Sequence, residues 1–290
     1  MEITASMVKD LRERTGAGMM DCKKALVETN GDMDKAIDYL REKGISKAAK
    51  KAERIAAEGL ANYYVKGNDA VVVELNSETD FVAKNAEFKE LLDTIGNTIL
   101  ESKTTDMESV LALKAGKETI NDLIVNATTK IGEKISLRRF EKVTKSKDEV
   151  FGTYLHMGGK IAVLTVVEGK SEEAAKDVAM QAAAMRPLYT TIESVPEADL
   201  EHEKSVIKEQ VINEGKKPEF ADKIVEGRIR KFYEETVLEE QAFIKDSDMN
   251  VKTYLENNKC KLVKLVRFEV GEGMEKRNDN FAEEVMSQIK

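Results

Sequence analysis

The sequence predicts an α+β protein built from small modules, and three patterns carry this prediction. The first 44 residues have the apolar spacing of three short helices. A hairpin, a helix and a closing strand then occur twice along the chain. The second copy is interrupted by residues 189–237, which have the pattern of two further helices. Such a pattern favours small antiparallel sheets, each covered by helices on one side.

The N-terminal 54 residues are expected to form a separate three-helix module with its linker. Apolar residues share one face of its third helix: Met33, Ile37 and Leu40. Thr4 and Asp32 stand where N-caps are needed, and Gly44 is expected to end the third helix. This module resembles the ubiquitin-associated domains. The Ala- and Lys-rich residues 45–58 predict a helical linker to the next domain.

The repeated unit can be recognised in its turns and apolar runs. The hairpin strands are expected at 60–65 and 70–75 around Gly67-Asn68, and at 153–157 and 161–167 around Gly158-Gly159. Glycine and asparagine accept the positive φ that short hairpin turns need. The following helices are expected at 86–100 and 172–184, and the closing strands at 135–141 and 262–269. Two core subdomains follow, one at 55–143 and one at 144–188 with 238–272.

The inserted segment 189–237 is predicted to be a helical hairpin. Pro196 opens its first helix, and Gly215-Lys216-Lys217-Pro218 separates the two helices. An apolar helical seam of this kind is often buried against a partner, so the hairpin is the expected site of a homodimer contact. The last segment, 273–290, predicts a C-terminal amphipathic helix with Phe281, Val285 and Ile289 on one side.

Composition and charge exclude several classes of function. The net charge is −8 and the pI is about 5.2, whereas a nucleic-acid-binding protein needs a basic face for phosphates. No apolar stretch approaches the roughly 20 residues that span a bilayer, so no membrane partner is expected. Cys22 and Cys260 are too few for a disulfide framework. The first residues lack a secretory signal, so a cytoplasmic protein is expected.

The residue types needed for catalysis are not gathered in any motif. His156 and His202 are the only histidines, and neither belongs to a Cys/His cluster with metal-ligand spacing. Gly158-Gly159-Lys160 is not a phosphate-binding loop, because Ile161 follows it and Tyr154 stands where that loop needs glycine. We therefore expect no enzyme activity, no cofactor and no metal.

Residues 79–85, Thr-Asp-Phe-Val-Ala-Lys-Asn, lie between an apolar strand at 71–75 and an amphipathic helix that begins at Ala86. Taken alone, Phe81 is predicted to be a core residue, and Asp80 is predicted to be a helix cap. A second motif, Thr-Gly-Ala-Gly-Met-Met-Asp-Cys-Lys-Lys-Ala-Leu, occupies residues 15–26. Together and in this order, the two motifs resemble the bacterial elongation factor Ts family, and the resemblance covers essentially the whole chain.

The resemblance implies a protein that releases GDP from elongation factor Tu and forms or breaks no covalent bond. It implies that Asp80 and Phe81 reach the nucleotide-binding domain of elongation factor Tu, where the phenyl ring wedges beside the Mg²⁺ and phosphate site. The further residues that it assigns to this partner are Thr79, Val82, Arg12, Met19, Met20, Ile131, Gly132 and His156. Near a second contact, around Ile244, Lys245 departs from the family's usual residue type.

Two alternatives remain open from the sequence. One is a scaffold protein whose three-helix module binds a ubiquitin-like partner and whose inserted hairpin dimerises; failure to bind elongation factor Tu would favour it. The other is a nucleotide-dependent enzyme, which binding of labelled GDP to the isolated chain would support.

Overall fold

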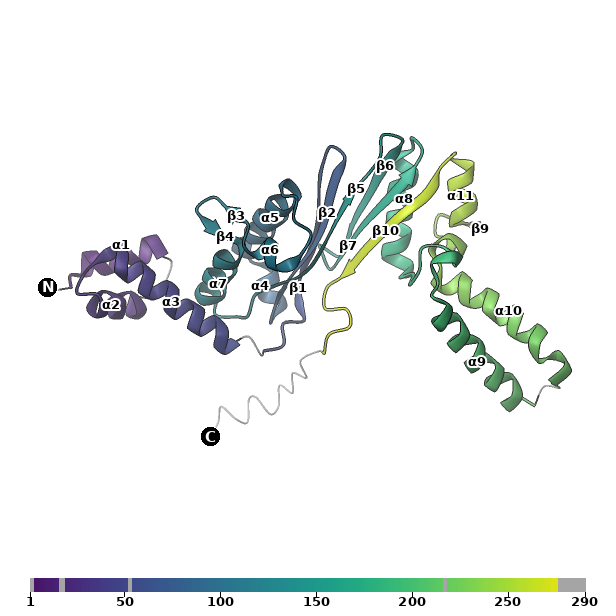
Figure 1. The fold of residues 1–290 in the computed structure, drawn as a ribbon, viewed down its shortest axis with the longest axis horizontal. Coiled ribbons are helices and arrows are strands. Elements are labelled where there is room, and N and C mark those ends of the chain that lie inside the picture. Colours follow the sequence, from purple (N-terminus) through teal and green to yellow (C-terminus); the bar gives the residue numbers. More distant parts are fainter. Residues whose placement is uncertain (1–2, 16–18, 52–53, 216–217, 276–290) are drawn as a thin grey trace. The chain divides into compact units, whose positions relative to one another are not determined.

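The computed structural model describes residues 3–15, 19–51, 54–215 and 218–275. The chain divides into two compact units: unit 1 comprises residues 1–66, 70–142 and 268–290, and unit 2 comprises residues 67–69 and 143–267. Helices and small sheets occur in both units, so the α+β prediction is confirmed (Figure 1). The finer division into a module, two subdomains and an inserted hairpin stays a prediction.

Unit 1 begins with three helices: α1 (Ala5–Thr15), α2 (Met19–Glu28) and α3 (Met33–Lys51). The expected caps are confirmed, since Thr4 Oγ1 accepts from the Met7 amide at 3.3 Å and Asp32 Oδ1 accepts from the Lys35 amide at 3.1 Å. A small apolar core holds the helices together, with buried Val8, Leu11, Cys22, Ala25, Leu26 and Ala36. The three-helix pattern therefore folds as the sequence predicts.

The predicted end of the third helix at Gly44 is wrong, because α3 continues to Lys51. A glycine inside a helix costs only about 1 kcal/mol relative to alanine, and good helix formers follow it. Helix α3 also packs against α7 (Ile120–Ile131). An ion pair of 3.6 Å joins Arg41 to Asp122 across this contact. Packing and local propensity together outweigh the cost of one glycine.

The sheet of unit 1 has the strand order β1-β2-β5, with β1 at Glu58–Lys66, β2 at Asp69–Ser77 and β5 at Ser136–Thr144. The predicted strands are therefore confirmed to within a few residues. Further elements are α4 (Asp80–Lys84), α5 (Ala86–Glu101), α6 (Met107–Leu111), β3 (Lys114–Ala115) and β4 (Glu118–Thr119). Phe88 and Ile95 of α5 are fully buried in one core with Val73 and Leu75 of β2. The elements between residues 102 and 134 were not predicted from the sequence.

In unit 2 the sheet has the order β10-β7-β6, with β6 at Glu149–His156, β7 at Ile161–Glu168 and β10 at Lys261–Glu269. Strands β6 and β7 pair antiparallel from Glu149↔Glu168 to His156↔Ile161. Helix α8 (Glu172–Met185) lies on this sheet. A Cβ atom at Gly152 would lie 2.0 Å from the Ala175 carbonyl oxygen, so glycine is required for this close approach.

The remaining elements of unit 2 are η1 (Ile192–Ser194), α9 (Glu197–Asn213), α10 (Pro218–Thr236), η2 (Leu238–Glu240), β8 (Ala242–Phe243), β9 (Asp246–Asn250) and α11 (Val251–Asn257). Helices α9 and α10 lie side by side and extend away from the sheet of unit 2, as predicted for the inserted hairpin (Figure 1). Ile207, Val211 and Ile229 bury one another in its seam. The short elements at 238–257 were not predicted.

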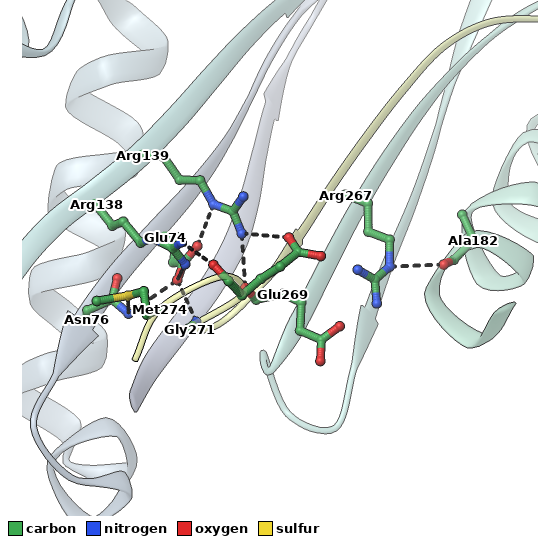
Figure 2. Close-up of polar contacts among 10 residues, drawn as sticks. Glu74, Asn76, Arg138, Arg139, Ala182, Arg267, Glu269, Gly271 and Met274 are labelled. Atoms are coloured by element: carbon green, nitrogen blue, oxygen red, sulfur yellow. Dashed lines mark hydrogen bonds and ion pairs between the residues drawn. The ribbon is translucent and has the colours of Figure 1, made fainter. Parts of the chain in front are cut away.

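A buried carboxylate joins the C-terminal segment of unit 1 to its sheet (Figure 2). Glu74 in β2 is fully buried and accepts from Arg138 Nη1 at 2.9 Å and from Arg139 Nε at 2.6 Å. It also accepts from the Gly271 amide at 2.9 Å and from Asn76 Nδ2 at 3.2 Å. The helix predicted at 273–290 is not tested, because residues 276–290 lie outside the described residues.

Candidate functional site

The segment between β2 and α5 folds as a short capped helix. Thr79 is the N-cap of α4, and its Oγ1 accepts from the Val82 amide at 3.5 Å. Asp80 is thus the first helical residue, and the cap predicted for Asp80 taken alone is instead Thr79. Asn85 ends α4 and caps α5 by accepting from the Glu87 amide at 2.9 Å. Thr79 and Asn85 thus cap the two junctions of this turn, one at the start of each helix.

The ring of Phe81 points away from the core. Phe81 is 79% exposed, whereas Val82 and Ala83 are 9% and 2% exposed and belong to the core of unit 1. The prediction of a core residue from Phe81 alone is wrong, because its neighbours in the helix supply the buried face. Val82, which the resemblance assigns to the partner contact, anchors α4 to the core, and its contact with a partner stays a prediction.

Charges flank the exposed ring. Lys84 Nζ lies 2.6 Å from Asp80 Oδ2, one helical turn away, and 5.8 Å from the centroid of the Phe81 ring. Exposed ion pairs at this spacing contribute only about 0.3–0.5 kcal/mol, so the pair does little to hold the helix. It places a carboxylate, an ammonium group and a phenyl ring next to one another on the surface.

The structure brings the segment after α7 to the same place. Helix α7 starts with a capping box, in which the hydrogen bond from the Thr119 amide is the main cause that holds the pKa of Asp122 below its usual range. It ends at Gly132, whose φ of 89° is left-handed. Ile131 is half-buried against the core. Glu133 follows and accepts hydrogen bonds from Thr79, so Ile131 and Gly132 lie beside the Thr79–Asn85 turn.

Both methionines at the start of α2 are exposed. Met19 is 60% and Met20 77% exposed, so neither fills the small core of the N-terminal helices. Flexible thioethers on a surface suit a contact that must adapt to a partner. The side chain of Arg12 and residues 16–18 of this motif lie outside the described residues.

His156 belongs to unit 2, where it ends β6 and stacks on Tyr154 with ring centroids 6.0 Å apart. The turn after it joins β6 to β7 as a hairpin, with φ of 65° and 98° at Gly158 and Gly159. Met157 in this turn is 72% exposed, and Leu155 is 38% exposed. Neither residue was predicted to be functional, although apolar residues next to a Gly-Gly turn are a signal of an exposed tip.

The unusual Lys245 has an internal partner. Its Nζ lies 2.6 Å from Asp177 Oδ1, and the Tyr254 hydroxyl donates to Asp177 Oδ2 at 2.8 Å. Burial, and then this hydrogen bond, raise the pKa of Tyr254 above its usual range. The neighbouring Ile244 remains 41% exposed. The lysine therefore satisfies a buried carboxylate and leaves the apolar neighbour on the surface.

Over the described ranges, no group of three or more His, Cys, Asp or Glu residues is placed to hold a metal ion. In the same ranges no helix has the length and apolar character to cross a membrane. Cys22 and Cys260 are both buried. The feature that stands out is an exposed phenyl ring on a turn that is capped at both ends and anchored in the core.

Aromatic residues and Met are enriched in protein–protein interfaces, so the exposed ring of Phe81 suits a protein that binds another protein. Comparison with known families agrees: a model of the family described as Elongation factor TS matches residues 78–272, which is more than half of the 290 residues. The chain therefore belongs to the elongation factor Ts family, a family of translation elongation factors that act in protein biosynthesis. The match includes Thr79–Val82, Ile131, Gly132 and His156. It begins after α2, so Met19 and Met20 lie outside it.

Proposed function

We propose that this chain promotes release of GDP from elongation factor Tu in the bacterial cytoplasm. The observation that carries the proposal is Phe81, which is 79% exposed while the next two residues, Val82 and Ala83, are buried in the core. A ring held in this way can enter a partner without first leaving its own core. Family membership supports elongation factor Tu as that partner.

The mechanism we propose is thermodynamic linkage. A protein that binds elongation factor Tu more tightly without GDP must weaken GDP binding by the same factor. Phe81 would supply apolar contact beside the Mg²⁺ and phosphate site of the partner, and Asp80 would offer a competing acceptor to the donors or water near that metal. The partner's Mg²⁺ and its ligands hold the phosphates of bound nucleotides, so loosening them frees GDP.

The direct test is the rate at which fluorescent GDP leaves elongation factor Tu, measured with and without this chain. We expect a large acceleration at substoichiometric amounts of the chain, because each copy is released when GTP rebinds. Labelled GDP added to the isolated chain tests the alternative of a nucleotide-dependent enzyme. No acceleration, together with a failure to bind elongation factor Tu, would favour the scaffold alternative.

Mg²⁺ and this chain should oppose each other on elongation factor Tu. Raising free Mg²⁺ should weaken binding of the chain to the GDP complex, since linkage is reciprocal. Asp80→Asn keeps the size of the side chain and removes its charge, so it should reduce GDP release more at high Mg²⁺ than at low Mg²⁺. The measurement is a titration of the GDP release rate against Mg²⁺ for the wild type and for Asp80→Asn.

The control for this titration is Lys84→Gln, because Asp80→Asn also removes the 2.6 Å ion pair with Lys84. If Asp80→Asn acts only by removing the ion pair, the two variants should have the same curve of GDP release rate against Mg²⁺. Stimulation that does not depend on Mg²⁺, with parallel curves for all proteins, would place the effect on the base or ribose side of GDP instead.

The inserted hairpin is proposed as an assembly element that is separate from the exchange site. Its ends meet, since the Leu188 and Tyr189 amides donate to the Thr236 carbonyl at 2.8 and 3.1 Å. A short Gly-Ser loop in place of residues 191–235 should therefore leave the core of unit 2 folded. We expect GDP release to be largely retained and self-association in sedimentation to be weakened.

The structure limits the surface available for such a dimer. Most of the hairpin's apolar residues fill its own seam, and among the described side chains of α9 and α10 Ile212 is the large apolar one on the surface, at 55% exposure. Ile212→Lys is thus a sharper companion to the loop replacement. Self-association that survives both changes would place the dimer contact elsewhere.

A further inference from the structure

The direction of the Phe81 ring needs a support that α4 cannot supply by itself. Helix α4 has only five residues, and helices this short are not stable on their own in water. The internal cap is also weak, since the Thr79 Oγ1 to Val82 amide distance of 3.5 Å is at the outer limit for a hydrogen bond. At 79% exposure, the ring has few contacts of its own to hold it.

We propose that Glu133 is a positioning residue, which holds the start of α4 and thereby sets the direction in which Phe81 is presented. This inference deepens the proposed function and rests on it for its activity readout. Glu133 reaches Thr79 from a position 54 residues further along the chain. It acts through Thr79 and is not itself expected to touch the nucleotide.

Two short hydrogen bonds carry the proposal. The Glu133 carboxylate accepts from the Thr79 amide at 3.0 Å and from the Thr79 hydroxyl at 2.7 Å. Both are shorter than the internal cap, and hydrogen bonds to a charged acceptor are roughly twice as strong as neutral ones. Because one oxygen binds the backbone and the other the side chain, Thr79 can neither shift nor rotate freely.

The residues on either side of Glu133 are held as well. Glu78, whose side chain is 7% exposed, accepts from the Lys134 amide at 2.6 Å and from Arg54 Nη1 at 3.3 Å. Lys134 Nζ in turn donates to the Arg54 carbonyl at 3.0 Å. Lys51, at the end of α3, donates to the Gly132 carbonyl. Glu133 is thus a rigid support, tied on one side to the end of β2 and on the other to the chain that follows α3.

We expect Glu133 to affect the geometry of the contact with the partner more than its affinity. A wedge works only when it meets its partner in the right geometry, and errors of about 1 Å can cost up to 100-fold in rate. Removal of Glu133 would leave Val82 and Ala83 buried and the helix attached, but would widen the range of directions open to Phe81. We therefore expect a fall in the maximal rate of GDP release that exceeds the loss of binding.

The first experiment measures the position of the ring in the free chain. The sequence has no tryptophan and seven tyrosines, so Phe81→Trp introduces one tryptophan that can be excited selectively. Time-resolved anisotropy then reports the local motion of this side chain. Glu133→Ala should increase that motion, and Glu133→Gln, which keeps one acceptor, should increase it less. The matched control is Glu101→Ala, which removes an equally charged residue paired with Lys66 at 2.8 Å on the surface. Equal anisotropy in all backgrounds would overturn the proposal.

The second experiment is a double-mutant cycle on GDP release from elongation factor Tu. Glu133→Ala should lower the maximal rate about tenfold in the wild type, and should have no further effect in a Phe81→Ala background. The same loss in both backgrounds would show that Glu133 acts independently of the ring and would overturn the positioning role. Should the unmodified chain not accelerate GDP release at all, the proposed function fails, and the anisotropy experiment alone decides the role of Glu133. If Glu133→Ala does not fold, Glu133→Gln decides both experiments.

Discussion

Phe81→Ala is expected to reduce GDP release from elongation factor Tu by about 30-fold, with almost no change in folding. Truncation of a central interface aromatic commonly costs about 2 kcal/mol or more, and every 1.4 kcal/mol is a factor of about ten. The ring is 79% exposed in the free chain and has Lys84 Nζ 5.8 Å from its centroid. Such an exposed contact contributes only about 0.5–1 kcal/mol. The measurements are the GDP release rate and the thermal unfolding curve.

Val65→Ala is the matched control, because Val65 is another exposed apolar residue of unit 1, at 44% exposure, and lies outside the candidate site. It should change neither the rate nor the unfolding curve. A Phe81→Ala protein that unfolds but keeps full activity in its folded fraction would contradict the wedge role. Equal losses for both variants would point to a general apolar effect.

The repeated hairpins could be predicted from sequence because their signals are local. Glycine at the turns accepts the required backbone, with φ of 61° at Gly67 and 65° at Gly158, and apolar runs on either side form the strands. The exposure of Phe81 could not be predicted in this way. Phenylalanine is usually buried. Only the resemblance of the whole Thr79–Asn85 motif indicated that Phe81 lies on the surface.

The residues that hold the site were not predicted, because their contacts are distant in sequence. Glu133 lies 54 positions from Thr79, and Gly271 lies 197 positions from Glu74. No periodicity or turn pattern marks a carboxylate that accepts from a segment so far away. At Gly44 a local signal gave a wrong prediction. Glycine predicts the end of the helix, but packing of α3 on α7 outweighs that preference.

Glu74→Ala should produce a large loss of stability in unit 1, about 3 kcal/mol. Removing one partner of a buried charge pair costs about 3–5 kcal/mol, and the lower value applies because Arg138 and Arg139 are 23% and 30% exposed and can reach water. The Gly271 amide also loses its acceptor (Figure 2). The measurement is native-state hydrogen exchange, in which the slowest amides of β2 and β5 report the stability of unit 1 separately from that of unit 2.

Glu272→Gln tests whether the loss of stability in Glu74→Ala depends on burial of the carboxylate and not on its charge alone. Glu272 also pairs with Arg139, at 3.2 Å, but its side chain is 45% exposed. Exposed pairs contribute about 0–1 kcal/mol, so this variant should exchange nearly as slowly as the wild type. The Gly271 amide should exchange faster in Glu74→Ala and not in Glu272→Gln, because Glu74 accepts its hydrogen bond. A loss below about 1 kcal/mol for Glu74→Ala would mean that desolvation of the carboxylate cancels its four hydrogen bonds, and that the apolar core alone stabilises unit 1.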